Sequence, residues 1–256
     1  MNALLAWLQS DHPQSRRQAA LGRAFAGWRA FASNRLALVG LGIVVALVAV
    51  ALLADVLAPF SPTVGDLNHA RLLPPSATYW LGTDDQGRDI LSRLMHGSRI
   101  TLVVVTLVAV LAAPVGLLVG TVAGYSGGWV DAVLMRFTDI FLALPKLILA
   151  LAFVAALGPG IENAVIAIAI TSWPPYARMA RAETLSIRQA DYISAVKLLG
   201  ASPARIVLRH VMPLCLPSVI VRVTLDMAGI ILTAAGLGFL GLGAQPPMPE
   251  WGAMIA

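Results

Sequence analysis

The chain has 256 residues, of which 58% are hydrophobic and 12% are charged, and its formal net charge at pH 7 is +5. Soluble domains carry about 25% charged residues, so this composition argues against a large soluble core and favours a membrane protein. The basic balance does not indicate nucleic-acid binding, because there is no polar fold on which the basic residues could cluster. We therefore predict an all-α helical bundle that crosses the membrane several times.

The first 35 residues are predicted to be a basic cytoplasmic segment, because residues 1–35 hold one acid, Asp11, against five arginines. Within this segment, Ala20–Phe31 mixes aromatic residues with arginine, which is typical of an amphipathic helix held on anionic lipid. A solvated basic tail is the other interpretation.

An apolar stretch at 36–58 is predicted to be the first transmembrane helix, and residues 59–96 an extracytoplasmic loop. The loop begins with several prolines and is therefore expected to start irregular. Its last part, Asp89–Met95, alternates apolar and charged residues at helical spacing. We expect this part to lie as a helix on the outer membrane face.

Four further spans are expected within a membrane core at 97–256, since a spanning helix needs about 20 mostly apolar residues. They lie near 101–123, 132–157, 161–176 and 211–235. Pro174-Pro175 is expected to limit the short third of these. Pro145 marks a point where the 132–157 span can kink.

Orientation follows from the distribution of Lys and Arg in the connections. With a cytoplasmic N-terminus, twelve of these residues face the cytoplasm and four face outward, while Lys146 and Arg222 lie in spans. Because cytoplasmic segments carry the excess of basic residues, we predict that the N-terminus is inside.

Between the last two spans lies a basic, broken stretch, DYISAVKLLGASPARIVLRHVMP, residues 191–213. Its apolar residues recur at helical spacing up to Gly200, the usual residue at which a helix stops in a left-handed turn. Ser202 can cap a second helix that has Pro203 at its first position. This pattern predicts a helix–turn–helix knob that is joined to the last span and that a soluble partner could grip. A routine loop resting on the membrane is the other interpretation.

The same stretch resembles the EAA loop of binding-protein-dependent ABC importers, whose pattern is Glu-Ala-Ala, three residues, Gly, nine residues, then Ile-x-Leu-Pro. Ala195, Gly200 and Pro213 match this pattern. Other positions depart from it: Ser194 replaces the glutamate, Val196 the second alanine, His210 the isoleucine and Met212 the leucine. Three more stretches resemble permeases of the dipeptide/oligopeptide/nickel family: WLGTDDQGRDILSRLMHGSRITL (80–102), MRFTDIFLALP (135–145) and LGFLGLGAQPPMPEWGAMI (237–255).

The resemblance implies the transmembrane domain of a type I ABC importer, a multi-pass protein of the bacterial inner membrane. Such permeases have six spans, so five are present here and a sixth is expected beyond Ala256. The implied activity is transport of dipeptides, oligopeptides or related small solutes by alternating access. The implied partners are a second homologous permease, two cytoplasmic ATPase subunits, an extracytoplasmic substrate-binding protein and membrane lipid. The ATPases would grip an EAA-like coupling loop at 183–212, through Tyr192, Ser194, Ala195, Val196, Gly200, Ala201 and Ser202.

The sequence has no ATPase motif of its own, since a P-loop requires Gly-x-x-x-x-Gly-Lys-Ser/Thr. The only lysines are Lys146 and Lys197, and neither follows a glycine. We therefore expect no enzymatic activity, catalytic residue, metal site or cofactor in this chain. ATP and Mg²⁺ are expected on the partner ATPases.

Ionisable residues inside spans are costly, so they are functional candidates by default. They are Asp139, Lys146, Arg222 and Asp226. Arg222 and Asp226 are four residues apart and could pair on one helix face, either as a structural brace or along the translocation path. Lys146 could neutralise Asp139, reach an interface or face the cavity.

Four residues are expected on the outer side: Asp84, Asp85, Glu250 and Trp251. They are candidates for docking the binding protein, and the other interpretation is a set of rigid turns that close the bundle. Two other functions also stay open at this point. One is an ion-coupled secondary transporter acting alone, and the other is a membrane scaffold without transport.

Overall fold

The computed structural model describes Trp7 and residues 15–255, and this part of the chain is helical with no β-strand. It divides into two compact units, residues 1–52 and 53–256. In the first unit, α2 (Arg16–Ala32) begins where the Ser15 hydroxyl accepts a hydrogen bond from the backbone N–H of Gln18 at 3.1 Å. The rings of Trp28 and Phe31 stack on this helix, with their centroids 5.8 Å apart. Most of α3 (Arg35–Leu57) also belongs to this unit.

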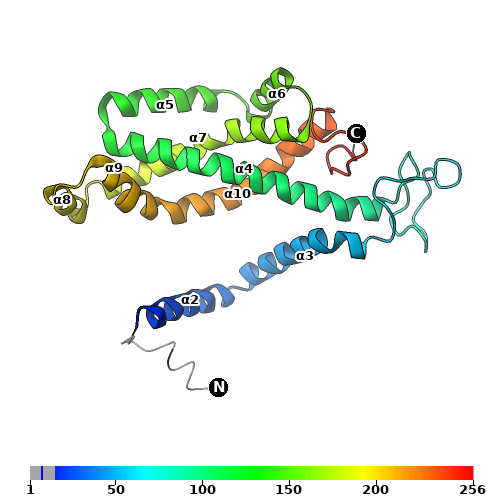
Figure 1. The fold of residues 1–256 in the computed structure, drawn as a ribbon, viewed down its shortest axis with the longest axis horizontal. Helices are drawn as coiled ribbons and strands as arrows, with labels where there is room; N and C mark the ends of the chain where they lie inside the picture. Colours follow the sequence, from blue (N-terminus) through cyan, green and yellow to red (C-terminus); the bar gives the residue numbers. More distant parts are fainter. Residues whose placement is uncertain (1–6, 8–14, 256) are drawn as a thin grey trace. The chain divides into compact units, whose positions relative to one another are not determined.

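The second unit is a bundle built around three long helices that pack side by side (Figure 1). Its elements are α4 (Ile90–Ser126), α5 (Gly128–Ala143), α6 (Lys146–Leu157), α7 (Ile161–Ile187), α8 (Asp191–Leu198), α9 (Pro203–Ile206), a π-helical turn η1 (Val207–Val211) and α10 (Met212–Phe239). The core lies where α4, α7 and α10 meet, and it includes Tyr176, Ile168 and Val219.

Three helical stretches among the described residues are long and apolar enough to cross a membrane: Arg35–Leu57, Ile90–Ser126 and Pro203–Phe239. The pair α5 and α6 could form a fourth span, bent by 93° at its break. This bend lies at Pro145, where the sequence allows a kink. Since α7 is not among these stretches, the count of five spans stays a prediction.

Small residues let α4 and α7 approach each other closely. Gly116, Gly120 and Gly124 recur every fourth residue on the α4 face that meets α7. A Cβ at Gly116 would stand 2.6 Å from the backbone oxygen of Trp173, and one at Gly124 would stand 2.8 Å from the Cβ of Thr184. Close approach over small residues is how helices associate in lipid, where no hydrophobic force draws them together.

Pro174-Pro175 does not end the helix, because α7 continues through both prolines to Ile187. That the prolines limit the membrane span stays a prediction. In the preceding turn, the hydroxyls of Thr171 and Ser172 both donate to the backbone oxygen of Ile168, at 3.0 and 2.6 Å. Interior prolines are tolerated where neighbouring helices and hydroxyl groups support the backbone. Here α7 packs along α4, and this contact holds the helix together on both sides of the prolines.

The predicted helix at Asp89–Met95 is confirmed, and these residues lead directly into α4. Their place on the outer membrane face stays a prediction. The Asp89 carboxylate caps α4 by accepting from the backbone N–H of Ser92 at 2.8 Å. With 37 residues, α4 is about 55 Å long, more than the roughly 30 Å of a bilayer's hydrocarbon core. One continuous helix therefore supplies both the span and its extension beyond the lipid.

The bundle places the two regions singled out in the sequence at opposite ends (Figure 1). The α8–α9 hairpin lies at the end where α4 passes into α5. The irregular loop that precedes α4 lies at the other end, together with the segment that follows α10.

Candidate functional site

The hairpin at residues 191–206 has the local structure that its sequence predicts. The first helix, α8, ends at Leu198, and Gly200 follows with a φ of +82°, in the left-handed region. The Ser202 hydroxyl then accepts from the backbone N–H of Arg205 at 3.4 Å, and Pro203 occupies the first turn of α9. The predictions of a glycine turn, a serine cap and an N-terminal proline are confirmed.

The body of the hairpin is anchored in the bundle. Ile193 and Ile206 are buried in the same core cluster as Tyr176, and Val196 and Ala201 pack against that cluster. The Tyr192 hydroxyl donates to the backbone oxygen of His210 at 3.3 Å. The ammonium of Lys197 lies 5.3 Å from the centroid of the Tyr125 ring, within range of a cation–π interaction.

The tip of the hairpin is apolar and exposed. Leu198 and Leu199 are 89% and 86% exposed, although burying a leucine stabilises by about 1.5–3 kcal/mol. The sequence reasoning missed this pair. The available signal was the position of the pair directly before Gly200, at the predicted turn. Among the predicted coupling residues, Tyr192, Ser194, Ala195, Gly200 and Ser202 are exposed, whereas Val196 and Ala201 are half-buried.

The hairpin is continuous with the longest apolar helix of the last third of the chain. From α9, the backbone passes through the π-helical turn η1 into α10 without an intervening loop. Displacing the hairpin would therefore move α10 directly.

The charged residues of the bundle pair differently from the sequence predictions. Asp226 accepts from the Tyr176 hydroxyl at 2.9 Å and lies 3.5 Å from the ammonium of Lys146. Asp139 instead pairs with Arg178, whose Nη2 is 2.6 Å from Oδ1. Thus Arg222 does not pair with Asp226, and Lys146 does not neutralise Asp139, which was one of its three possible roles. The reason for the second is the 93° bend between α5 and α6, since spacing along one straight helix does not apply across it.

A second ion pair joins α5 to α7 near the hairpin end. The guanidinium of Arg181 binds the Asp131 carboxylate with two hydrogen bonds, of 2.5 Å from Nε and 2.6 Å from Nη2. Such two-point geometry holds both side chains in a defined orientation. It braces α7, the helix that leads into the hairpin, against α5.

At the end of the bundle opposite the hairpin, most of the candidate residues for docking the binding protein form hydrogen bonds within the chain instead. Asp84 accepts from the backbone N–H groups of Gln86 and Arg88, both at 2.9 Å, and from the Arg88 Nε at 2.7 Å. The buried Glu250 accepts from the N–H groups of Gly252 and Ala253, at 2.9 and 2.8 Å. These contacts fit the rigid-turn interpretation. The Asp85 side chain, by contrast, is 68% exposed.

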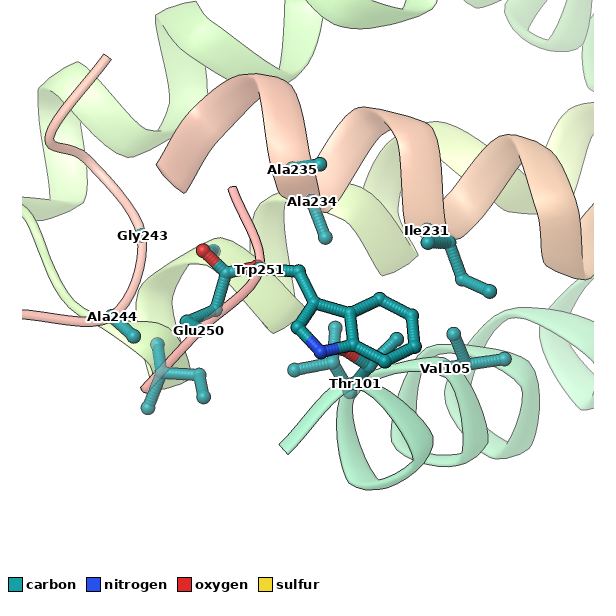
Figure 2. A pocket seen from close by; sticks show the side chains of 12 residues that line it. Thr101, Val105, Ile231, Ala234, Ala235, Gly243, Ala244, Glu250 and Trp251 are labelled. Atoms are coloured by element: carbon teal, nitrogen blue, oxygen red, sulfur yellow. The ribbon is translucent and has the colours of Figure 1, made fainter. Parts of the chain in front are cut away.

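Trp251 fills the space between two helices at this end. Figure 2 shows its ring between Thr101 and Val105 of α4 and Ile231 and Ala234 of α10. Its Nε1–H donates to the backbone oxygen of Leu94 at 3.2 Å. The tryptophan therefore ties the segment after α10 to the start of α4.

Comparison with known proteins identifies the family. Residues 116–256 match the family described as binding-protein-dependent transport system inner membrane component. Residues 25–75 match the N-terminal transmembrane domain of oligopeptide transport permease C. The chain belongs to this permease family. The predicted resemblance, all-α membrane fold and permease function are confirmed.

The permease is similar to several curated proteins over most of its length. It is 46% identical to a di/tripeptide transport system permease of Pseudomonas aeruginosa, with 90% of this chain and 77% of the relative aligned. It is 47% identical to a probable D,D-dipeptide transport system permease of Escherichia coli, with 78% and 67% aligned. It is 41% identical to a glutathione transport system permease of Pectobacterium atrosepticum, with 89% and 76% aligned.

Among solved structures, the inward-facing MetNI methionine ABC transporter has a similar fold. The TM-score is 0.53 at 22% identity, over 59% of this chain and 76% of the other. The permease is thus the membrane part of an ABC importer, a multi-pass inner-membrane protein that works with ATPase and permease subunits and is not itself the enzyme.

The outer loop of the permease should depend on the ionised form of Asp84. Partial burial raises the pKa of the Asp84 carboxyl, whereas hydrogen bonds from Arg88 and Gln86 lower it. The hydrogen bonds have the larger effect, so the pKa lies below the ordinary aspartate value. A group with a lowered folded-state pKa stabilises the fold above its unfolded pKa, about 3.9, and loses this effect as pH falls through the folded pKa.

We expect Asp84→Asn to loosen the loop at residues 58–89 at neutral pH by about 1–3 kcal/mol, the range for charged hydrogen bonds. When the pH falls from 7 to 3, hydrogen exchange of the loop should also increase less in the variant than in the wild type. Hydrogen exchange of the loop between pH 7 and pH 3 measures both effects. Asp85→Asn is the matched control, and equal exchange in both variants would contradict the structural role of Asp84.

Proposed function

We propose that this permease imports dipeptides or tripeptides across the inner membrane, driven by two cytoplasmic ATPase subunits that grip the α8–α9 hairpin. The substrate class is supported by the relatives, which are named for di/tripeptides, D,D-dipeptides and glutathione, itself a tripeptide. All three substrates are small peptides that carry free carboxylates.

The observation that carries this proposal is the exposed leucine pair on an anchored hairpin. Leu198 and Leu199 offer apolar surface to a partner, while the buried Ile193 and Ile206 hold the hairpin to the bundle. A partner that binds the tip therefore acts on the whole bundle through a rigid connection. This arrangement suits mechanical coupling better than a surface loop would.

In the proposed orientation the N-terminus and the hairpin face the cytoplasm. The loop at 58–89 and the segment after α10 then face outward, where the binding protein delivers its cargo. We propose that the exposed Asp85 contributes to that docking surface, and that Asp84, Glu250 and Trp251 shape the surface from within. A second homologous permease completes the translocation path.

The proposed cycle is alternating access. ATP binding draws the two ATPases together and moves both hairpins, so that the permease pair changes from inward-open to outward-open. Hydrolysis resets the pair. Nucleotide can drive this change only by binding one conformation more tightly than the other.

The test is copurification followed by reconstitution. The permease, purified from its own membrane, should bring with it an ATPase subunit and a second permease. In liposomes, the complex with its binding protein should take up Ala-Ala when ATP is supplied. Uptake by this chain alone, driven by an ion gradient, would instead establish the secondary transporter.

A further inference from the structure

Helix α10 carries a polar stripe along one face of an otherwise apolar span. Ser218, Arg222, Asp226 and Gly229 recur at intervals of four, four and three residues, so they lie on the same face. The opposite face is apolar and includes Ile220, which borders a groove against α4. The stripe therefore marks the side of α10 that does not suit lipid.

The ionisable residues on and beside this stripe include one more positive charge than negative charges. Asp139 pairs with Arg178, and Asp226 pairs with Lys146. Within residues 15–255, Arg222 has no ion-pair partner, and its side chain is exposed. One positive charge is thus left over on the exposed side of α10, near the middle of the apolar stretch Pro203–Phe239. An unpaired arginine at this depth is costly unless it faces water or an anion.

Arg222 shares a pocket with Arg178. A pocket of about 340 Å³ is lined by Arg178 of α7 and Arg222 of α10, together with Leu142, Pro175 and Met179. Because Arg178 already pairs with Asp139, an anion in this opening would meet the uncompensated guanidinium of Arg222, with that of Arg178 beside it. The remaining wall is apolar and could contact an aliphatic side chain.

We propose that Arg222, with Arg178 beside it, binds the carboxylate of the transported peptide during its passage. This inference rests on the proposed function for its substrate class. A guanidinium binds a carboxylate through two parallel hydrogen bonds, which neither acid of this region offers to Arg222. Because both nearby acids already pair with cations, the site favours the carboxylate end of a peptide over its ammonium end.

Lipid headgroups carry the same anionic chemistry but do not fit the position. Arg222 lies close to the midpoint of the apolar stretch Pro203–Phe239, so we infer that it lies away from both layers of headgroups. The site also suits transport, because one surplus charge binds weakly enough to release its cargo.

The first test is uptake of Ala-Ala by the reconstituted complex. Arg222→Gln should lower the initial uptake rate roughly tenfold, whereas Arg222→Lys should keep a large part of it. Stimulation of ATP hydrolysis by the loaded binding protein should persist in both variants. Arg136→Gln, which removes an exposed arginine of α5 outside the pocket, is the matched control. Wild-type uptake by Arg222→Gln would overturn the proposal.

A second test does not depend on the peptide. In the assembled complex, Met179→Cys, which lines the same pocket and keeps both arginines, should react from water with sulfonatoethyl methanethiosulfonate about threefold faster than with the aminoethyl reagent, each rate normalised to a free thiol. Adding Arg222→Gln to this variant should remove the preference for the anionic reagent. Ile220→Cys should react slowly with both, and the buried Cys215 should contribute little background.

Failure to label Met179→Cys, or a preference for the cationic reagent, would overturn the inference even if Ala-Ala is transported. If the wild-type complex does not take up Ala-Ala but Met179→Cys prefers the anionic reagent and loses this preference with Arg222→Gln, the peptide assignment fails and the anion site stands.

Discussion

Replacing both exposed leucines, Leu198→Ser with Leu199→Ser, should abolish ATP-driven uptake and release the ATPase subunits from the permease. Burying two leucines is worth roughly 3–6 kcal/mol, which corresponds to more than a hundredfold in affinity. Because both side chains are almost fully exposed in the bundle, the substitution should leave its fold intact. Quantitative copurification of the ATPase and the Ala-Ala uptake rate measure the effect.

The matched control is Leu67→Ser, an exposed leucine in the loop before α4, at the end of the bundle opposite the hairpin. It should leave ATPase copurification unchanged. Normal copurification and uptake by the double variant would refute the coupling role of the hairpin. Melting of the double variant at the wild-type temperature would show that a loss of uptake is not caused by unfolding.

Gly120→Val should destabilise the helical bundle itself. A Cβ at this position would clash with the backbone oxygen of Ala177 and stand 2.8 Å from the Cβ of Ala180, so α4 and α7 would have to separate. Overpacking of this kind costs about 1–3 kcal/mol or more. Total stabilities are only about 5–15 kcal/mol. The melting temperature in detergent should therefore fall by roughly 2–12 °C.

Gly42→Val in α3 is the control for the change in helix propensity, because a Cβ at Gly42 meets nothing within 4 Å in the structure. It should shift the melting temperature far less than Gly120→Val. Equal shifts would mean that the α4–α7 contact does not depend on the glycine.

The hairpin was predictable because its determinants are local. Gly200, Ser202 and Pro203 act on their own backbone or on residues three positions away, so their order along the chain predicts the turn, the cap and the start of the next helix. The apolar composition likewise predicts a membrane bundle, since lipid requires every spanning backbone to satisfy its hydrogen bonds internally.

The pairing of charges was not predictable in this way. Spacing along one helix suggested that Arg222 would pair with Asp226, but Lys146 and Tyr176 reach Asp226 from two other helices. The continuation of α7 through Pro174-Pro175 also depends on a neighbour, because α4 supports it from the side. Neither result is contained in the spacing of residues along the chain.

The sequence by itself thus determined a helical membrane protein, a rigid hairpin before its last apolar helix, and its family. Only the tertiary structure decided that Leu198 and Leu199 stay exposed and that Arg222 is left as the surplus charge in a pocket with Arg178. The physical reason is that turns and caps act between near neighbours in the chain. Burial and ion pairing depend on distances between helices, which residue spacing does not contain.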